Sequence, residues 1–266
     1  MANLSGHLAV FRMSVKTQLA YKTDYFISLL FRMARPLILL MVWTAIYLNT
    51  GTSTIGGLTL SGVSAYFFLV MPVILIINEA IIDTMQADVQ NGSVASSLIK
   101  PMNYPLNVLS RSLGTYAADI VLVALPLLVL TFVVFHIAAT PLSLFLFLIE
   151  TLVGIAIVSL IGFFIGTLAI RLTNVYGLAT VVWGVMGVLS GAMIPLSFFP
   201  AYAQNLLMLS PFPIQCYLPV ATLLGTVSNA QIFVGIAYGI GWAVLLLALA
   251  YLWWGKMSKS MGAAGG

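Results

Sequence analysis

The positively charged residues of this chain fall in alternate connections between long apolar segments. About six segments have the length and apolarity of membrane spans. Three of the connections between them, residues 49–61, 136–141 and 195–230, contain no Lys or Arg. Cytoplasmic connections are the ones enriched in these residues. The pattern therefore predicts a multi-pass inner-membrane protein with both termini in the cytoplasm. The cations assigned to the cytoplasmic side are Arg12, Lys16, Lys22, Lys100, Arg111, Arg171, Lys256 and Lys259.

Charged side chains are too scarce in this chain for a soluble protein. Apolar residues make up 62% of the sequence and charged residues 6%, whereas soluble domains carry about 25% charged residues. Lipid must therefore be the solvent for most of the surface. The net charge of +4 is explained by the inward bias of the cations and by anionic lipid, so it is no sign of nucleic-acid binding. The single cysteine, Cys216, has no partner for an internal disulfide.

The apolar segments predict an all-α membrane protein with six transmembrane helices, forming one domain over residues 25–256. Before it, apolar residues recur every three or four positions in residues 1–24, which predicts an amphipathic helix lying on the membrane. A cytoplasmic helix packed on protein is the open alternative. Residues 195–219 are apolar but broken by proline, which predicts short helices at the outer face, and residues 257–266 are expected to form a flexible cytoplasmic tail. The expected spans are residues 25–48, 62–82, 108–135, 142–170, 174–194 and 232–254.

Several motifs that carry chemistry are missing from the sequence. A phosphate-binding loop needs G-x-x-x-x-G-K followed by Ser or Thr, but Gly255 and Lys256 are followed by Met257. His7 and His136 are far apart, so no metal-ligand spacing occurs. Neither a G-x-S-x-G motif nor a pair of closely spaced catalytic carboxylates is present. The chain is therefore not expected to hydrolyse ATP alone, to hold a metal or to act as an enzyme by itself.

Two segments carry a family resemblance. Residues 88–104 read DVQNGSVASSLIKPMNY, a polar-glycine turn followed by a leucine and a basic-proline pair. Residues 189–200 read LSGAMIPLSFFP, with SPF at 210–212 and Gly225 further on. These segments resemble the permeases of type 2 ATP-binding-cassette (ABC) exporters, especially the viologen-exporter-like branch. Relatives often have a charged residue where this chain has Asn91.

The resemblance implies a transport mechanism and partners. Two permease subunits, either identical or paralogous, would pair in the membrane, and two separate ATPases would bind ATP and Mg for them. The cytoplasmic segment 83–104 would contain the coupling helix that docks on the ATPase. A small amphipathic or lipid-like compound would be moved outward by alternating access. The residues expected to take part in ATPase coupling are Asp88, Asn91, Gly92, Lys100 and Pro101.

Ionisable and aromatic residues inside the expected spans are candidates for a translocation path. Charged groups at membrane depth are costly and usually face a protein interior or a water-filled cavity. Contact with a cargo and pairing between acidic residues and the arginines of the first span are both open readings. The candidates are Arg32, Arg35, Tyr66, Glu79, Asp119, Glu150 and Trp183.

Small residues recur at a spacing of four, a pattern that lets membrane helices approach closely. Gly162 with Gly166, and Gly187 with Gly191, are expected to pack helices together within the chain or between subunits. Two alternatives to the permease hypothesis stay open at this point. One is a membrane-embedded or lipid-modifying enzyme, which the missing catalytic motifs disfavour. The other is an ATP-independent channel or secondary transporter, which the lack of an internal repeat disfavours.

Overall fold

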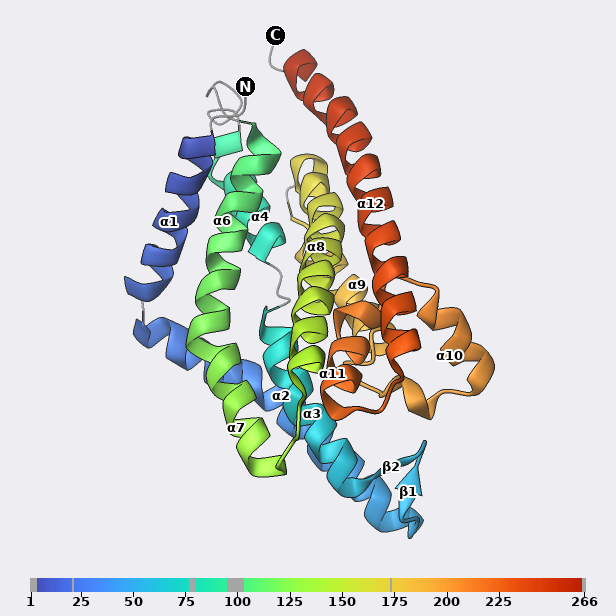
Figure 1. Ribbon diagram of the computed structural model, residues 1–266. Helices are drawn as coiled ribbons and strands as arrows, with labels where there is room; N and C mark the ends of the chain where they lie inside the picture. Colours follow the sequence, from blue (N-terminus) through green and yellow to red (C-terminus); the bar gives the residue numbers. More distant parts are fainter. Residues whose placement is uncertain (1–3, 21, 77–79, 95–102, 173, 265–266) are drawn as a thin grey trace.

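The computed structural model describes residues 4–20, 22–76, 80–94, 103–172 and 174–264. The described part is almost entirely helical, with one short hairpin of strands β1 (Thr54–Ile55) and β2 (Leu58–Thr59). Figure 1 shows the start of α1 and the end of α12 at the same end of the molecule, with the hairpin at the opposite end. The helices are α1 (Leu4–Ala20), α2 (Lys22–Thr50), α3 (Leu60–Ile76), α4 (Ala80–Gln90), α6 (Tyr104–Asp119), η1 (Ile120–Ala124), α7 (Leu125–Phe135), α8 (Pro141–Leu172), α9 (Tyr176–Leu189), η2 (Leu196–Phe198), α10 (Ala201–Met208), η3 (Pro213–Gln215), α11 (Tyr217–Leu224) and α12 (Asn229–Ala264).

Four helical stretches of the described chain are long and apolar enough to cross a membrane: Leu60–Gln90, Tyr104–Phe135, Pro141–Leu172 and Asn229–Met257. Two shorter apolar helices, Leu37–Thr50 and Tyr176–Leu189, coincide with the other two expected spans. The multi-pass character of the chain is thus confirmed. The 14 residues of α9 extend only about 21 Å at 1.5 Å per residue, less than a hydrocarbon core of about 30 Å. That all six segments cross the membrane stays a prediction.

The third expected span contains a polar helix followed by an apolar one. The first half, α6, carries several polar side chains, whereas α7 is apolar almost throughout. The turn between them, η1, is a π-helix, and Pro126 lies in the first turn of α7. Proline lacks a backbone N–H and its ring collides with the carbonyl four residues earlier, so a widened turn relieves the conflict. The helix therefore continues from the polar half into the apolar half without a break.

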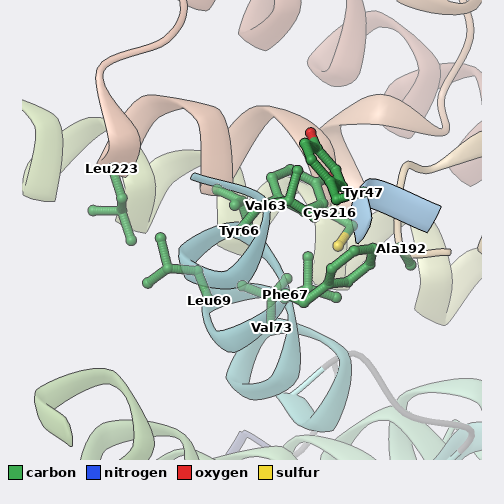
Figure 2. Close-up of a cluster of buried hydrophobic side chains, with 11 residues drawn as sticks. Tyr47, Val63, Tyr66, Phe67, Leu69, Val73, Ala192, Cys216 and Leu223 are labelled. Carbon is green, nitrogen blue, oxygen red and sulfur yellow. The ribbon is translucent and has the colours of Figure 1, made fainter. Parts of the chain in front are cut away.

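Helix α3 lies at the centre of the half of the molecule that includes the hairpin. Val63, Tyr66, Phe67 and Val70 on it are all buried. Figure 2 shows side chains from α2, α3, the 190–192 turn and the α11 region gathered around this helix. Of the short helices between α9 and α12, α10 buries no residue, whereas α11 buries most of its length. The segment expected at the outer face thus contains short helices, and one of them belongs to the core.

Helix α1 packs against α6. A Cβ atom added at Gly114 would lie 2.5 Å from the Cβ of Ser14 and 2.8 Å from the carbonyl oxygen of Phe11, so the two backbones nearly touch there. His7 is buried, and its Nδ1 lies 3.5 Å from the Ser110 hydroxyl. This arrangement favours the alternative of a helix packed on protein. Whether the exposed side of α1 also contacts lipid stays a prediction.

Candidate functional site

Helix α4 ends in a tight turn at Asn91 and Gly92. The Asn91 N–H donates to the Ala87 carbonyl at 2.9 Å, and the Gly92 N–H donates to the Val89 carbonyl at 3.1 Å. Gly92 has φ of +66°, the left-handed conformation in which a side chain is strained and glycine is favoured. Asn91 and Gly92 are both exposed. The tip of the turn is therefore open to solvent in the part of the chain that the structure describes.

The base of this turn is held by Asp88, whose carboxylate is buried and engaged at both oxygens. Arg111 on α6 binds it with two nitrogens, donating to Oδ1 at 3.0 Å and to Oδ2. The Ser93 hydroxyl donates to Oδ1 at 3.0 Å, and the Tyr104 hydroxyl donates to Oδ2 at 3.1 Å. Two-nitrogen binding of a carboxylate by arginine is strong and fixes direction as well as distance. The turn is therefore rigidly attached to the start of α6.

The same region forms an apolar cluster that joins four helices. Val94, just after the turn, is buried with Met85 of α4, Val108 of α6 and Phe163 of α8. Trp254 of α12 packs against this cluster. Movement of the turn therefore cannot leave the ends of these helices unaffected, because close-packed interiors transmit strain.

The expected ATPase-coupling residues divide into three groups. Asn91 and Gly92 lie at the exposed tip. Asp88 is turned inward and positions the turn, and a direct contact with an ATPase through Asp88 stays a prediction. Lys100 and Pro101 lie outside the described residues.

The sequence reasoning identified Arg111 only as a cation of the cytoplasmic side and missed its pairing with Asp88. It also missed Tyr104 and Trp254 as contacts of the turn. The pair is 23 residues apart, so no local spacing signals it. A polar arginine early in a long apolar segment is the one hint that the sequence offers.

The candidate translocation-path residues that the structure describes lie on separate helices. The Tyr66 hydroxyl on α3 donates to the Gly191 carbonyl at 2.7 Å. Glu150 on α8 is fully buried and accepts a hydrogen bond from the Thr222 hydroxyl of α11 at 3.0 Å. Asp119 is buried at the end of α6, and Trp183 on α9 packs against Val175 and its neighbours. Glu79 and the side chains of Arg32 and Arg35 lie outside the described part, so the expected pairing with these arginines stays a prediction.

Three of the four predicted packing glycines lie close to other segments of the same chain. A Cβ at Gly162 would lie 3.5 Å from Ile82, and one at Gly166 would lie 2.7 Å from the sulfur of Met85, so α8 meets α4 along this stripe. Gly191 has φ of +86°, and a Cβ there would lie 2.8 Å from both Tyr66 and Tyr217. The carbonyl of Gly187 accepts from the Met193 N–H at 2.9 Å. Gly162 and Gly166 thus lie where α8 packs on α4, whereas Gly191 lies in the turn after α9. A packing role for Gly187, or for any of these glycines between subunits, stays a prediction.

Aromatic side chains bind backbone carbonyl groups of the hairpin and of the region between α9 and α12. The sequence patterns did not predict these contacts. The Trp43 indole donates to the Met193 carbonyl at 3.3 Å. The Tyr47 hydroxyl donates to the Leu58 carbonyl at 2.8 Å, and the Trp242 indole donates to the Leu209 carbonyl at 2.8 Å. Carbonyl groups of non-helical backbone need such donors where water is excluded.

A family model described as ABC-2 family transporter protein matches residues 33–265. This chain belongs to the ABC-2 family. The match covers all the apolar segments apart from the first residues of α2, and it confirms the resemblance to type 2 ABC permeases at the level of the family. A comparison with curated protein sequences gives no match.

Membership in the ABC-2 family makes this chain a membrane transport subunit rather than an enzyme. Permeases of the ABC-2 family typically work with an ABC ATPase, which supplies the nucleotide site. The exposed Asn91–Gly92 turn lies in the segment for which the resemblance implies contact with that ATPase. No group of His, Cys, Asp and Glu suited to a metal ion occurs among the residues that the structure describes.

Proposed function

We propose that this chain is the permease subunit of an ATP-driven ABC exporter and that the Asn91–Gly92 turn is its docking point for the ATPase. The observation that carries the proposal is the contrast between the two parts of this turn. Its tip is exposed, whereas its base is held by the buried Asp88 carboxylate and the paired Arg111. A segment that transmits movement from an ATPase to a permease needs an exposed tip for contact and a fixed base. A flexible base would absorb the movement of the ATPase.

The proposed movement passes from α4 to the helices in contact with it. The Gln86 side chain of α4 is buried and accepts from the Val175 N–H at the start of α9, at 3.0 Å. This bond links the fifth span to the docking segment. Together with the close crossing of α4 and α8, it supports transmission of ATPase closure to the fourth and fifth spans. Coupling of this kind requires two arrangements of the helices that differ in their contacts.

The finer features of the proposal follow the family resemblance. The chain would lie in the inner membrane with both termini in the cytoplasm, pair with an identical or paralogous permease, and bind two ATPases that carry ATP and Mg. The cargo would be a small amphipathic compound of the kind handled by viologen-exporter-like permeases. Nucleic acid is not among the proposed partners. The residues proposed to line the path are Arg32, Arg35, Tyr66, Glu79, Asp119, Glu150 and Trp183.

Purification of the tagged full-length chain in mild detergent tests the proposal. The wild-type preparation should contain a second polypeptide and hydrolyse ATP in a vanadate-sensitive manner. Asn91→Trp should abolish both properties, because a bulky apolar ring at the exposed tip obstructs docking, and it should not lower the amount of folded chain, because Asn91 is exposed. Thr52→Trp, at an exposed position beside the hairpin, is the matched control and should leave both unchanged.

Two outcomes would contradict the proposal. Full ATPase retention by the Asn91→Trp variant would show that the turn is not the docking point. Transport of a cargo by the purified chain alone, without ATP, would refute the exporter hypothesis in favour of a channel or secondary transporter.

A further inference from the structure

Tyr104 makes two different contacts at the start of α6. Its hydroxyl donates to Asp88 at the base of the Asn91–Gly92 turn, at 3.1 Å. Its ring stacks on Trp254 of α12, with ring centroids 5.3 Å apart and an interplanar angle of 23°. Tyr104 is itself buried, at 3% exposure. One rigid side chain with few rotatable bonds thus connects the turn to the last helix of the chain.

The half of α12 around Trp254 is exposed on one side and packed on the other, where Ala250 and Met257 are buried. Tyr251 is 81% exposed and Leu252 is 62% exposed. Trp254 also touches Phe163 of α8, with ring centroids 5.9 Å apart. The neighbouring Trp253 donates from its indole to the Thr167 hydroxyl of α8 at 2.8 Å. Aromatic side chains therefore account for much of the contact between this half of α12 and the rest of the described chain.

We infer that Tyr104 is a positioning residue that carries movement of the Asn91–Gly92 turn to α12, through its hydrogen bond to Asp88 and its stacking on Trp254. The inference rests on the proposed ATPase docking at this turn. It adds the sixth span to the fourth and fifth spans, which the proposed movement reaches through α4. Tyr104 does not itself touch the ATPase.

The two contacts of Tyr104 are suited to carrying movement from Asp88 to Trp254. A hydrogen bond to a carboxylate is stronger than one between neutral groups, so the phenol follows Asp88 when the turn moves. Stacked aromatic rings attract each other beyond simple area burial, so the Trp254 ring follows the phenol. Arg111 and Ser93 also hold Asp88. Loss of the Tyr104 hydroxyl should therefore leave the turn in place and weaken its connection to α12.

Two spin labels on the full-length chain test the inference in the complex with its ATPase, in lipid nanodiscs, with and without ATP. In a Cys216→Ser background, one label is attached at Tyr251→Cys on the exposed side of α12 and the other at Leu113→Cys on α6. In the otherwise native chain, both labels should change mobility or position when ATP is added. Tyr104→Phe keeps the ring but lacks the hydroxyl, and Trp254→Leu lacks the stacking surface. Both variants should show a smaller ATP response at position 251 and keep the full response at position 113.

The matched controls are conservative. Trp254→Phe retains an aromatic surface and should keep the response at both labels. Tyr116→Phe removes the hydroxyl of another buried tyrosine on α6, which lies 3.5 Å from the Ser159 hydroxyl, and it should also keep both responses. ATPase binding should be unchanged in every variant.

Distinct outcomes overturn the inference and the proposed function. An undiminished response at position 251 in Tyr104→Phe and Trp254→Leu overturns the inference. Loss of ATPase binding in Tyr104→Phe also overturns it, because Tyr104 would then belong to the docking site. Absence of any bound ATPase, or of any response at position 113 in the native chain, refutes the proposed function and the inference with it.

Discussion

Glu150 shows how much a single side chain depends on its neighbour in an apolar interior. The carboxyl group is fully buried, and only Oε1 has a hydrogen-bond partner among the described residues, the Thr222 hydroxyl. A buried polar group that loses its partner costs about 1–3 kcal/mol. Ionisable groups at such positions are expensive and tend to be functional, which supports the place of Glu150 among the path candidates.

Thr222→Val should therefore destabilise the chain by about 1–3 kcal/mol, because neither oxygen of Glu150 would keep a donor. The effect should appear as a melting temperature several degrees lower, followed by tryptophan fluorescence in detergent. Glu150→Gln should have a smaller effect, because the amide oxygen still accepts from Thr222. Thr180→Val, at an exposed position of α9, is the control. Equal melting temperatures for the Thr222 and Thr180 variants would contradict the prediction.

Cys216 should react slowly with maleimides in the folded chain. It is the single cysteine of the sequence and is 2% exposed, so the reagent reaches it only when the α11 region opens. Labelling should become fast after unfolding in SDS, as measured by mass spectrometry over time. Ser53→Cys in a Cys216→Ser background should label rapidly in the folded state, because position 53 is exposed. Comparable rates for the two thiols in the folded chain would disprove the buried position.

At the scale of elements, glycines decide where helices can cross. The stripe of Gly162 and Gly166 lets α8 lie directly against α4, and Met85 fills the space at Gly166. On α9, by contrast, nothing lies within 4 Å of a Cβ added at Gly184. The glycines of the two helices thus differ in their surroundings. Gly166 on α8 allows contact with α4, whereas Gly184 on α9 faces open space.

Gly166→Ala and Gly184→Ala should change stability in opposite directions. The first adds a methyl group 2.7 Å from the Met85 sulfur and 3.1 Å from its Cβ, and overpacking of this kind costs about 1–3 kcal/mol. The second adds helix propensity worth up to about 1 kcal/mol with no collision. Unfolding by SDS titration measures both. A stabilising effect at Gly166 would show that the α4–α8 crossing is looser than described.

At the scale of the whole molecule, the hairpin lies at one end, and α4 lies in the other half, toward the end that holds the start of α1 and the end of α12 (Figure 1). The cations that the sequence assigns to the cytoplasm include Arg111 and Arg171. Arg111 binds Asp88 beside the turn, and Arg171 lies in the last turn of α8. The arrangement agrees with the orientation that the charge pattern predicts.

Impermeant maleimide should therefore distinguish the two ends in intact cells. In a Cys216→Ser background, Ser53→Cys should be labelled from outside, and Asn91→Cys should be labelled only after the membrane is permeabilised. Both positions are exposed, so a difference in rate reports the side of the membrane. Labelling of Asn91→Cys in intact cells would reverse the orientation and remove the basis for ATPase docking.

The amino-acid sequence by itself determined the class of the protein. Apolar segments, scarce charge and one-sided cations are local properties, and every membrane helix satisfies its own backbone hydrogen bonds wherever it packs. The two motifs at residues 88–104 and 189–212 sufficed to identify the family, and the glycine spacing identified the close crossing of α8. The left-handed turn at Gly92 is also a local feature, because glycine alone adopts it without strain.

Only the tertiary structure decided which of these residues meet. The Asp88–Arg111 pair, the hydrogen bond of Tyr104 to Asp88 and the contact between Glu150 and Thr222 join positions 23, 16 and 72 residues apart. The stacking of Tyr104 on Trp254 and the packing of α1 on α6 are likewise invisible in the order of residues. Apolar surfaces carry no code for their partners, since a membrane helix gains almost as much from lipid as from another helix. Complementary shape and the pairing of the few polar groups decide the packing. Neither can be read from the order of residues, because each depends on which helices come together.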